Sequence, residues 1–191
     1  MSRPKGLRVI AGSARGRKLA APPGDRVRPT KDMVREAMFS ALHARGALVD
    51  AKVLDLFAGT GALGIEALSR GATRAVLVER DRAALDAIST NVVTLRLGDR
   101  ARVVADDVGR FLRGPLPAGT PFDLVLLDPP YDTTDEDVTA LLEALDAPGW
   151  LAPDAIVSVE RPARHPVVVP HGWRTGWERA FGDTLLTFCS R

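Results

Sequence analysis

From Lys52 onward the chain alternates between short apolar, β-branched runs and segments of helical periodicity. The apolar runs lack a polar alternation, which is typical of strands that are covered on both faces. These runs span residues 52–57, 74–79, 101–106, 123–128 and 155–160, and the helical patterns lie between them at 61–70, 81–95, 107–112 and 135–146. Alternating strands and helices predict an α/β fold in which right-handed crossovers build a doubly wound, mostly parallel, Rossmann-like sheet.

The last thirty residues lose the helical signal. Three segments there look like strands joined by tight turns: 165–170 ("HPVVVP"), 173–181 ("WRTGWERAF") and 183–191 ("DTLLTFCSR"). These segments predict that the sheet, which we expect to be seven-stranded, ends in an antiparallel hairpin.

Before the first parallel strand, the pattern predicts a small extension. Residues 7–20 contain two β-prone runs around a bend rich in Gly, Ser and Arg, which predicts a β-hairpin. A helix follows in "RPTKDMVREAMFSALHARG", where Thr30 can cap the first turn. Its expected buried stripe consists of Met33, Val34, Ala37, Met38, Ala41 and Leu42. We divide the chain into an extension of residues 1–45 and a main domain of residues 46–191.

Composition restricts the covalent and metal sites that can form and the cellular location that we expect. Cys189 is the only cysteine, so neither an intrachain disulfide nor a Cys-rich zinc site can form. The three histidines are scattered without metal-ligand spacing, and we expect no metal. No apolar run is long enough to span a membrane, and the basic N-terminus is not followed by the apolar stretch of a signal peptide. We expect a cytoplasmic protein without a membrane partner.

The net charge of +2 conceals an uneven distribution. Residues 1–45 hold eleven Lys and Arg against three acids, a balance of +8, whereas the remainder carries −6. Clustered basic residues attract phosphates and release their counterions, so this extension favours a polyanionic partner such as nucleic acid. A merely solvated basic terminus is the alternative.

A glycine-rich loop follows the first predicted parallel strand. Gly59, Gly61 and Gly64 in "DLFAGTGALG" match the G-x-G-x-x-G spacing of a nucleotide site, which lets the backbone approach a ligand at the carboxyl edge of the sheet. Glu79 ends the next strand and can accept hydrogen bonds from two ribose hydroxyls. NAD and S-adenosylmethionine both offer that ribose.

Acidic residues near this loop help to separate the two cofactors. Asp55 would repel a pyrophosphate but attract an amino acid end that carries ammonium and sulfonium charges. Asp106 or Asp107, after the third strand, can accept a hydrogen bond from an adenine amino group. Phe57, in the same loop, is a further candidate cofactor-binding residue, although we expect its ring, like Leu63, to pack in the core rather than stack on the cofactor.

The fourth parallel strand ends in "DPPY", beside the first strand across the switch point of a doubly wound sheet. An exocyclic amine on a nucleobase is a poor nucleophile because its lone pair is delocalised. The Asp128 carboxylate and a carbonyl fixed by Pro129 and Pro130 can accept its two hydrogens and hold its nitrogen toward an activated methyl group. Tyr131 offers a face on which the base can stack. Such a base must be flipped or single-stranded.

Four alternatives follow from these motifs. A DNA methyltransferase acting on adenine N6 or cytosine N4 would use the same "DPPY" chemistry. Cytosine C5 methylation is less plausible because it requires a cysteine nucleophile, and Cys189 lies far along the chain in an expected core strand. The glycine spacing permits an NAD-dependent oxidoreductase, but no acid–base pair for hydride transfer is evident. A catalytically silent RNA-binding module would not need Asp128 and Tyr131.

The motifs "DLFAGTGALG" and "DPPY" together resemble those of the class I S-adenosylmethionine-dependent amino-methyltransferases. With "RVIAGSARGRKL", "RPTKDMVREAMF" and "GALGIEALSRGA", the chain resembles the RsmD family of bacterial 16S rRNA guanine-N2 methyltransferases from about Leu7 to "GDTLLTF". The resemblance implies S-adenosyl-L-methionine as cofactor and 16S rRNA in the small ribosomal subunit as partner.

Carried over by position, the resemblance implies a role for each motif residue. It places the methionine end of the cofactor at Asp55, Gly59 and Gly61, its ribose at Glu79, its adenine at Asp106 or Asp107, and the target amine at Asp128, Pro129, Pro130 and Tyr131. It further implies that the extension binds the nucleic acid. The hairpin would contact rRNA phosphates through Arg8, Arg15, Arg17 and Lys18, and the border of the pocket would be formed by Arg28, Thr30 and Arg35.

Overall fold

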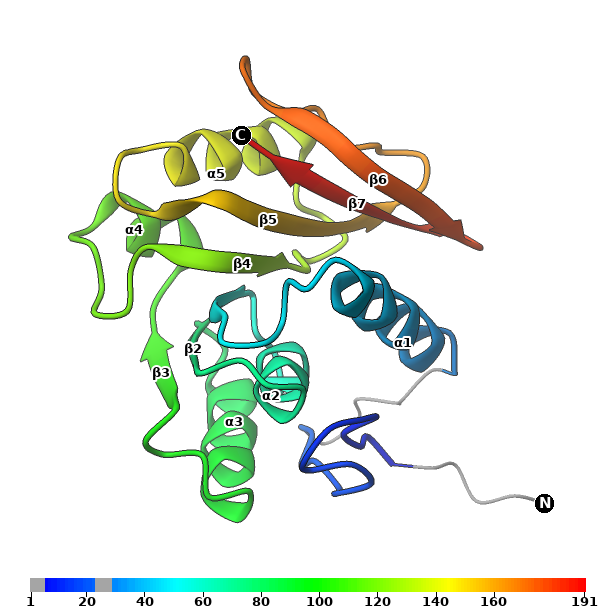
Figure 1. Ribbon diagram of the computed structural model, residues 1–191, viewed down its shortest axis with the longest axis vertical. Helices are drawn as coiled ribbons and strands as arrows, with labels where there is room; N and C mark the ends of the chain where they lie inside the picture. The colour runs from blue at the N-terminus through cyan, green and yellow to red at the C-terminus, as the bar shows by residue number, and fades with distance from the viewer. Residues whose placement is uncertain (1–5, 23–28) are drawn as a thin grey trace.

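The computed structural model describes residues 6–22 and 29–191. Its centre is one seven-stranded sheet in the order β3-β2-β1-β4-β5-β7-β6 (Figure 1). The strands are β1 (Lys52–Leu56), β2 (Arg74–Glu79), β3 (Ala101–Ala105), β4 (Phe122–Leu127), β5 (Leu151–Pro162), β6 (Arg174–Phe181) and β7 (Thr184–Ser190). β1 to β5 are parallel, and β7 runs antiparallel to both β5 and β6. The predicted doubly wound sheet with an antiparallel end is confirmed.

Helices cover both faces of this sheet. They are α1 (Pro29–Ala44), α2 (Ala62–Ser69), α3 (Arg82–Thr94), α4 (Val108–Arg113) and α5 (Asp135–Leu145). α1, α2 and α3 pack on one face together with the N-terminal segment, by which we mean residues 6–22. α4 and α5 pack on the other face. Alternate residues of each central strand enter the two cores, as in Val53 and Leu54 of β1, because successive side chains point to opposite faces.

The strand predicted at residues 165–170 does not form. This segment is irregular in the structure, and β6 begins only at Arg174. Pro166 and Pro170 donate no backbone hydrogen bond, so the run forms no ladder, although Val167 and Val169 pack against the α4–α5 core while Val168 is 61% exposed. β5 instead extends from Leu151 to Pro162 and is longer than expected.

Helix α1 differs from the prediction in two respects. It begins at Pro29, so Thr30 lies within the first turn rather than ahead of it as a cap. Proline suits the first helical position because its missing N–H would be unpaired there. The predicted buried stripe was wrong for Met33, which is 53% exposed, and it omitted Phe39, which is fully buried. Residues four apart along a helix share a face, so the true stripe follows Val34 and Met38, with Phe39 beside them.

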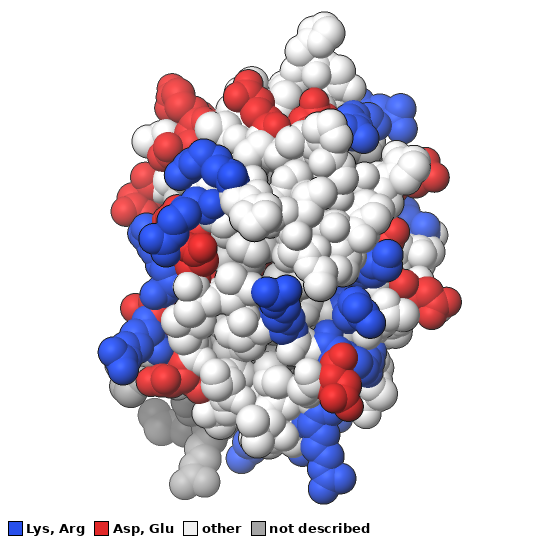
Figure 2. Space-filling model, turned by 90° about the vertical axis from the view of Figure 1, so that its left-hand side faces the viewer, with Lys and Arg blue, Asp and Glu red and all other residues white. Residues whose placement is uncertain are grey.

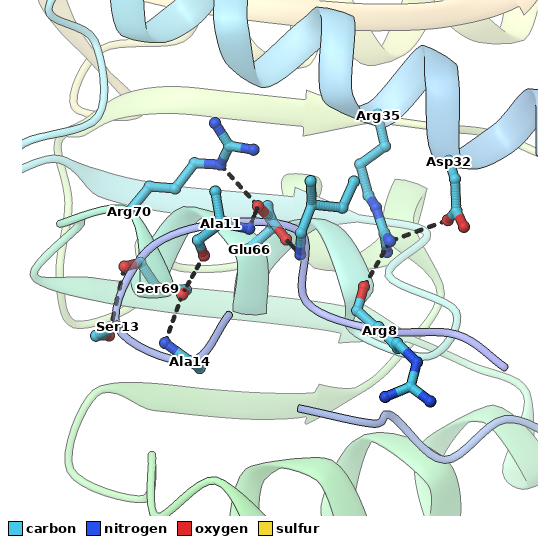
Figure 3. Close-up of polar contacts among 10 residues, drawn as sticks. Arg8, Ala11, Ser13, Ala14, Asp32, Arg35, Glu66, Ser69 and Arg70 are labelled. Carbon is cyan, nitrogen blue, oxygen red and sulfur yellow. Dashed lines mark hydrogen bonds and ion pairs between the residues drawn. The ribbon is translucent and has the colours of Figure 1, made fainter. Parts of the chain in front are cut away.

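The N-terminal segment contains one antiparallel bridge, between Arg8 and Lys18, rather than a full hairpin. Its backbone is held by a buried carboxylate from α2 (Figure 3). The two Oε atoms of Glu66 accept hydrogen bonds from the N–H groups of Ile10 (2.7 Å) and Ala11 (2.9 Å). Glu66 also pairs with Arg70 at 2.7 Å and is itself fully buried.

The end of α2 and helix α3 hold the rest of this segment. Ser69 Oγ donates to the carbonyl of Ala11 at 2.6 Å and accepts from the N–H of Ala14 at 2.9 Å (Figure 3). Asn91 of α3 accepts from the N–H of Ala20 and donates to the carbonyls of Ala20 and Thr60. The basic segment is therefore a fixed part of the same core as the sheet.

None of the helices in the described part of the chain has the length and apolarity that a membrane crossing requires. Across residues 6–22 and 29–191, no group of three or more His, Cys, Asp or Glu side chains could hold a metal ion.

Candidate active site

A cavity of about 470 Å³ opens at the carboxyl edge of the sheet, between the loops that follow β1, β2 and β4. A smaller cavity of about 150 Å³ adjoins it under α1. Five residues line both cavities: Lys31, Phe57, Gly59, Asp128 and Glu160. β1 and β4 are neighbours although they are distant in the sequence, which makes this the switch point where doubly wound folds bind ligands. The glycine loop and "DPPY" thus meet as the sequence predicted.

The loop after β1 has an unusual backbone. Gly59 and Gly61 have φ values of 55° and 74°, and Phe57 has a φ of 60°. A bulky residue rarely adopts this left-handed region, and such strain is often found at ligand sites. The Phe57 ring packs against the α4–α5 core, as expected, and also borders the cavity.

Gly64 allows α2 to lie directly on the sheet. A Cβ atom at this position would approach Leu77 Cδ2 to 2.4 Å and Asp55 Oδ2 to 3.1 Å. The third glycine of the motif therefore serves close helix–strand packing, as in other G-x-G-x-x-G loops.

Asp55 lies beneath this loop and is 1% exposed. Its Oδ2 accepts a 2.8 Å hydrogen bond from the N–H of Gly64, whereas Oδ1 is buried and has no partner among the described residues. Burial raises the pKa of Asp55 to about 7, against the opposing effect of the Gly64 hydrogen bond, and the charges of Asp128 and Glu79 raise it further. A buried, unpaired carboxylate oxygen in such a place fits a cationic ligand group.

Glu79 ends β2 and braces the glycine loop. Its Oε2 accepts from the N–H of Gly59 at 2.9 Å, and its Oε1 accepts from the N–H groups of Arg80 and Asp81. The carboxylate lines the larger cavity. A carboxylate has about four lone-pair sites, so three backbone donors leave one site for a further hydrogen bond.

The two acids after β3 have different partners. Asp107 caps α4 by accepting from the N–H of Arg110, and it pairs with Arg80 at 3.1 Å. The Arg110 N–H lowers the pKa of Asp107, and Arg80 adds to this effect. Asp106 accepts from the N–H of Asp107 and pairs with the Arg110 side chain. Which of the two contacts adenine stays a prediction.

The "DPPY" turn leaves β4 directly. Asp128 is partly buried and faces the cavity, Pro129 is buried, and Pro130 is exposed. Tyr131 is 60% exposed at the rim of the cavity. Burial raises the pKa of Asp128, and Lys31 opposes the increase.

Sequence reasoning missed several charged residues of this cavity, among them Glu160, near the end of β5, and Lys31 on α1. Burial and the Asp128 charge raise the pKa of Glu160 to about 8, with Lys31 acting in the opposite direction. The sequence did place Glu160 at the end of a predicted strand. An acid at that position, on the strand adjacent to "DPPY", was a signal that could have been used.

Arg161 was also missed, and it supports the "DPPY" turn from behind. Its guanidinium donates to the Thr133 carbonyl at 2.8 Å and pairs with Asp135 at 2.6 Å. Asp135 begins α5, and hydrogen bonds from Arg161 and then His165 lower its pKa. Arg161 thus ties the end of the turn to β5.

The basic residues of the extension divide into exposed and internal groups. Arg15, Arg17 and Lys18 are exposed; Arg17 also donates to the Thr94 carbonyl. Arg8 is partly buried and donates to the Gly16 carbonyl.

Arg35 borders the smaller cavity, yet it is only 6% exposed and holds the Arg8 carbonyl and Asp32 (Figure 3). Its burial lowers its pKa. Arg28 lies outside the described residues. On the face in Figure 2, basic and acidic side chains are interspersed around an uncharged area, so no continuous basic patch covers that side. RNA contacts by all these residues stay predictions.

Comparison with known proteins adds independent findings. Residues 7–190 match the family described as "Conserved hypothetical protein 95". The chain is 41% identical over 186 residues to ribosomal RNA small subunit methyltransferase D of Escherichia coli K12, covering 97% of this chain and 90% of that protein. It is 34% identical over 180 residues to the protein of the same name from Haemophilus influenzae, covering 92% and 89%.

Solved structures agree with the observed fold. The Escherichia coli protein yhhF superposes with a TM-score of 0.84 at 37% identity, over 98% of both chains. The rRNA methyltransferase aviRa from Streptomyces viridochromogenes has a TM-score of 0.69 over 89% of this chain and 88% of its own, at 18% identity, and therefore shows a common fold alone.

The sheet and the cavity at its switch point define the class, a Rossmann-like methyltransferase. Within that class, the chain belongs to the RsmD family, as its motifs indicated.

Proposed function

We propose that this protein transfers a methyl group from S-adenosyl-L-methionine to the exocyclic N2 of a guanine in 16S rRNA. The supporting observation is the convergence of the glycine loop and Asp128 on one cavity. The relatives named for small-subunit rRNA methylation support the choice of rRNA. In 16S rRNA the expected nucleotide is guanine 966, the position that the RsmD type implies.

The residues around the glycine loop suit the proposed cofactor. The unpartnered Oδ1 of Asp55 would accept the ammonium of the methionine end, and the backbone at Gly59 and Gly61 would allow close approach. Glu79 would accept a ribose hydroxyl with its remaining lone-pair site, and Asp106 or Asp107 would accept from the adenine amine. When bound, S-adenosylmethionine supplies an electrophilic methyl group on a sulfonium centre.

Asp128 would act on the nucleophile. Its carboxylate would accept one hydrogen of the amine, and a carbonyl of the rigid "DPPY" turn would accept the other, which orients the nitrogen for direct in-line transfer without a covalent enzyme intermediate. Burial raises the pKa of Asp128, so it is a better proton acceptor than a free aspartate, and the proton can leave the methylated nitrogen toward it. Tyr131 would stack on the base.

The rival hypotheses differ in their support. Cys189 lies in β7 opposite Val157, deep in the sheet rather than at its carboxyl edge, and burial raises its pKa to about 12; both features disfavour a C5 nucleophile. Family membership disfavours the NAD-dependent oxidoreductase. Methylation of DNA at adenine N6 or cytosine N4, and a silent RNA-binding module, are decided by the substrate test.

The test is methyl transfer to three substrates: under-methylated small ribosomal subunits, naked 16S rRNA and DNA, each followed by nucleoside mapping. We expect N2-methylguanosine in the rRNA, formed more efficiently in small ribosomal subunits than in naked 16S rRNA. Methylation of DNA at N6-adenine or N4-cytosine in preference to rRNA would establish the rival enzyme. Turnover on none of the three would favour the silent module.

A further inference from the structure

Glu160 is the immediate neighbour of Asp128 across the sheet. β4 and β5 are parallel with Leu127 opposite Val159, so the next residue of each strand, Asp128 and Glu160, reaches the carboxyl edge at the same level. Residues in register on adjacent strands point to the same face, and both side chains line the two adjoining cavities. Glu160 therefore belongs to the pocket that would hold the target base.

Neither carboxylate is satisfied by the protein. Within residues 6–22 and 29–191, the Asp128 and Glu160 side chains accept no hydrogen bond and form no ion pair. The next residue of β5 behaves differently, because Arg161 points to the opposite face and is bonded to Thr133 and Asp135. Lys31 is the charged group whose field opposes the repulsion between the two acids. Both carboxylates are partly buried and border open cavities, so their acceptor oxygens are available to donors that a ligand supplies.

The Watson–Crick edge of guanine supplies those donors. Beside its N2 amine, guanine carries N1–H, so its edge offers adjacent donors. Adenine and cytosine instead carry an unprotonated ring nitrogen beside their amines, which would face Glu160 with a lone pair against a carboxylate. A pocket that reads a flipped base by this edge can therefore select guanine through the residue next to Asp128.

We propose that Glu160 is a specificity-determining residue that accepts a hydrogen bond from N1–H of the target guanine while Asp128 accepts from the adjacent N2 amine. This inference rests on the proposed function and extends it by assigning the choice of base. The pKa of Glu160, about 8 without substrate, supports it, because a donor from the base would stabilise the ionised form that the protein alone stabilises poorly.

The experiment uses the full chain and small subunits assembled from two-piece 16S rRNA, whose synthetic piece carries guanine or 2-aminopurine at the target position. 2-Aminopurine keeps the C2 amine but has an unprotonated N1. The wild-type protein should methylate guanine at least about 100-fold faster than 2-aminopurine, because a site built for a hydrogen bond rejects an analogue that lacks the donor.

Glu160→Gln should lower the ratio of the rate on guanine to the rate on 2-aminopurine by about 10-fold or more. The rate on 2-aminopurine itself should rise, because the amide can donate to N1. Glu160→Ala should lose rate on guanine without that gain. Asp128→Asn provides the matched comparison, since it should slow both substrates by the same factor and leave the ratio unchanged. Melting curves of each variant verify that it is folded.

An unchanged ratio in Glu160→Gln, with both rates reduced equally, would overturn the inference and leave the proposed function intact. Absence of N2 methylation by the wild-type protein on the guanine subunit would overturn both.

Discussion

The N-terminal segment and the acidic edge formed by Asp128 and Glu160 both contain charged side chains, but only the segment is held by a carboxylate whose partners the protein supplies. In the segment, the fully buried Glu66 accepts from two backbone N–H groups and pairs with Arg70. At the acidic edge, the two carboxylates repel each other and have no partner among the described residues. Both regions lie on the same face of one sheet.

The difference shows how to separate structural charge from functional charge. A buried carboxylate whose acceptors are filled by the protein stabilises the fold, and its removal leaves donors unpaired. A buried carboxylate whose acceptors remain open costs stability and is available to a ligand. Replacing residues in each region should therefore affect different properties of the protein.

Asp128→Ala tests the acidic edge and should have the largest effect. Loss of the positioned acceptor should reduce methyl transfer at least about 1000-fold, with affinity for S-adenosylmethionine near normal. Rates on under-methylated small subunits and calorimetric titration with the cofactor measure the two properties. Equal losses of both would remove the assigned role of Asp128.

Glu66→Ala tests the opposite region. It leaves the N–H groups of Ile10 and Ala11 and the Arg70 guanidinium without their partner, so the free energy of unfolding should fall by about 3 to 5 kcal/mol. Denaturant unfolding measures the change. Glu143→Ala, at an exposed position of α5, is the control and should stay within about 0.5 kcal/mol of wild type. A similar stability in both variants would contradict the structural role of Glu66.

Glu160→Gln should stabilise the protein, and the gain should depend on pH. The pKa of Glu160 is about 8 in the folded chain and 4.5 ordinarily, so between these values the folded form keeps a proton that the unfolded form loses. Wild-type stability therefore falls as pH rises through this window, by on the order of 2 kcal/mol relative to the variant.

Unfolding of both proteins at pH 5 and pH 8.5 gives the comparison. Asp128 and Asp55 titrate in both, so the difference between the proteins isolates Glu160 and its coupling to Asp128. A difference that does not vary with pH would show that Glu160 is not buried as an acid of raised pKa.

The exposed basic residues should give the smallest effects. Single replacements of Arg15, Arg17 or Lys18 by Ala should each reduce the slope of log affinity against log salt by about 1 for RNA, if each contacts one phosphate. Filter binding to 16S rRNA at several salt concentrations measures the slope. Arg74→Ala, at the exposed amino end of β2, is a control outside the extension, and an equal change there would argue against a specific basic surface.

Much of the fold followed from the sequence because it depends on local patterns. Five parallel strands and their helices produced clear apolar runs, and the glycine loop and "DPPY" mark strand ends that a doubly wound sheet must bring together. The predicted strand at 165–170 was wrong because its two prolines cannot donate the backbone hydrogen bonds of a ladder, although its valines favour a strand. Met33 was misassigned because adjacent residues at the start of a helix differ little in periodicity but point in different directions.

The remaining features depend on which elements become neighbours. Glu160 and Asp128 are far apart in the chain, and only the β4–β5 register makes them adjacent. The anchoring of the N-terminal segment likewise depends on Glu66 and Ser69, which read in the sequence as polar positions of a surface helix. The local pattern places Glu160 at the end of a predicted strand, but it does not show which residue of a distant strand lies beside it.

Helix α2 connects the cofactor loop at one end to the basic loop of the N-terminal segment at the other. Gly61 precedes its first turn at the cofactor loop, and Ser69 at its far end holds the loop that bears Arg15. Gly12 of that loop lies so close that a Cβ atom would be 1.9 Å from the Ser69 carbonyl oxygen. Eight helical residues span about 12 Å, so α2 sets a fixed separation between the cofactor loop and the loop that bears Arg15. In the proposed complex, this fixed separation would favour an RNA strand whose phosphate and exposed base lie at the matching distance from each other.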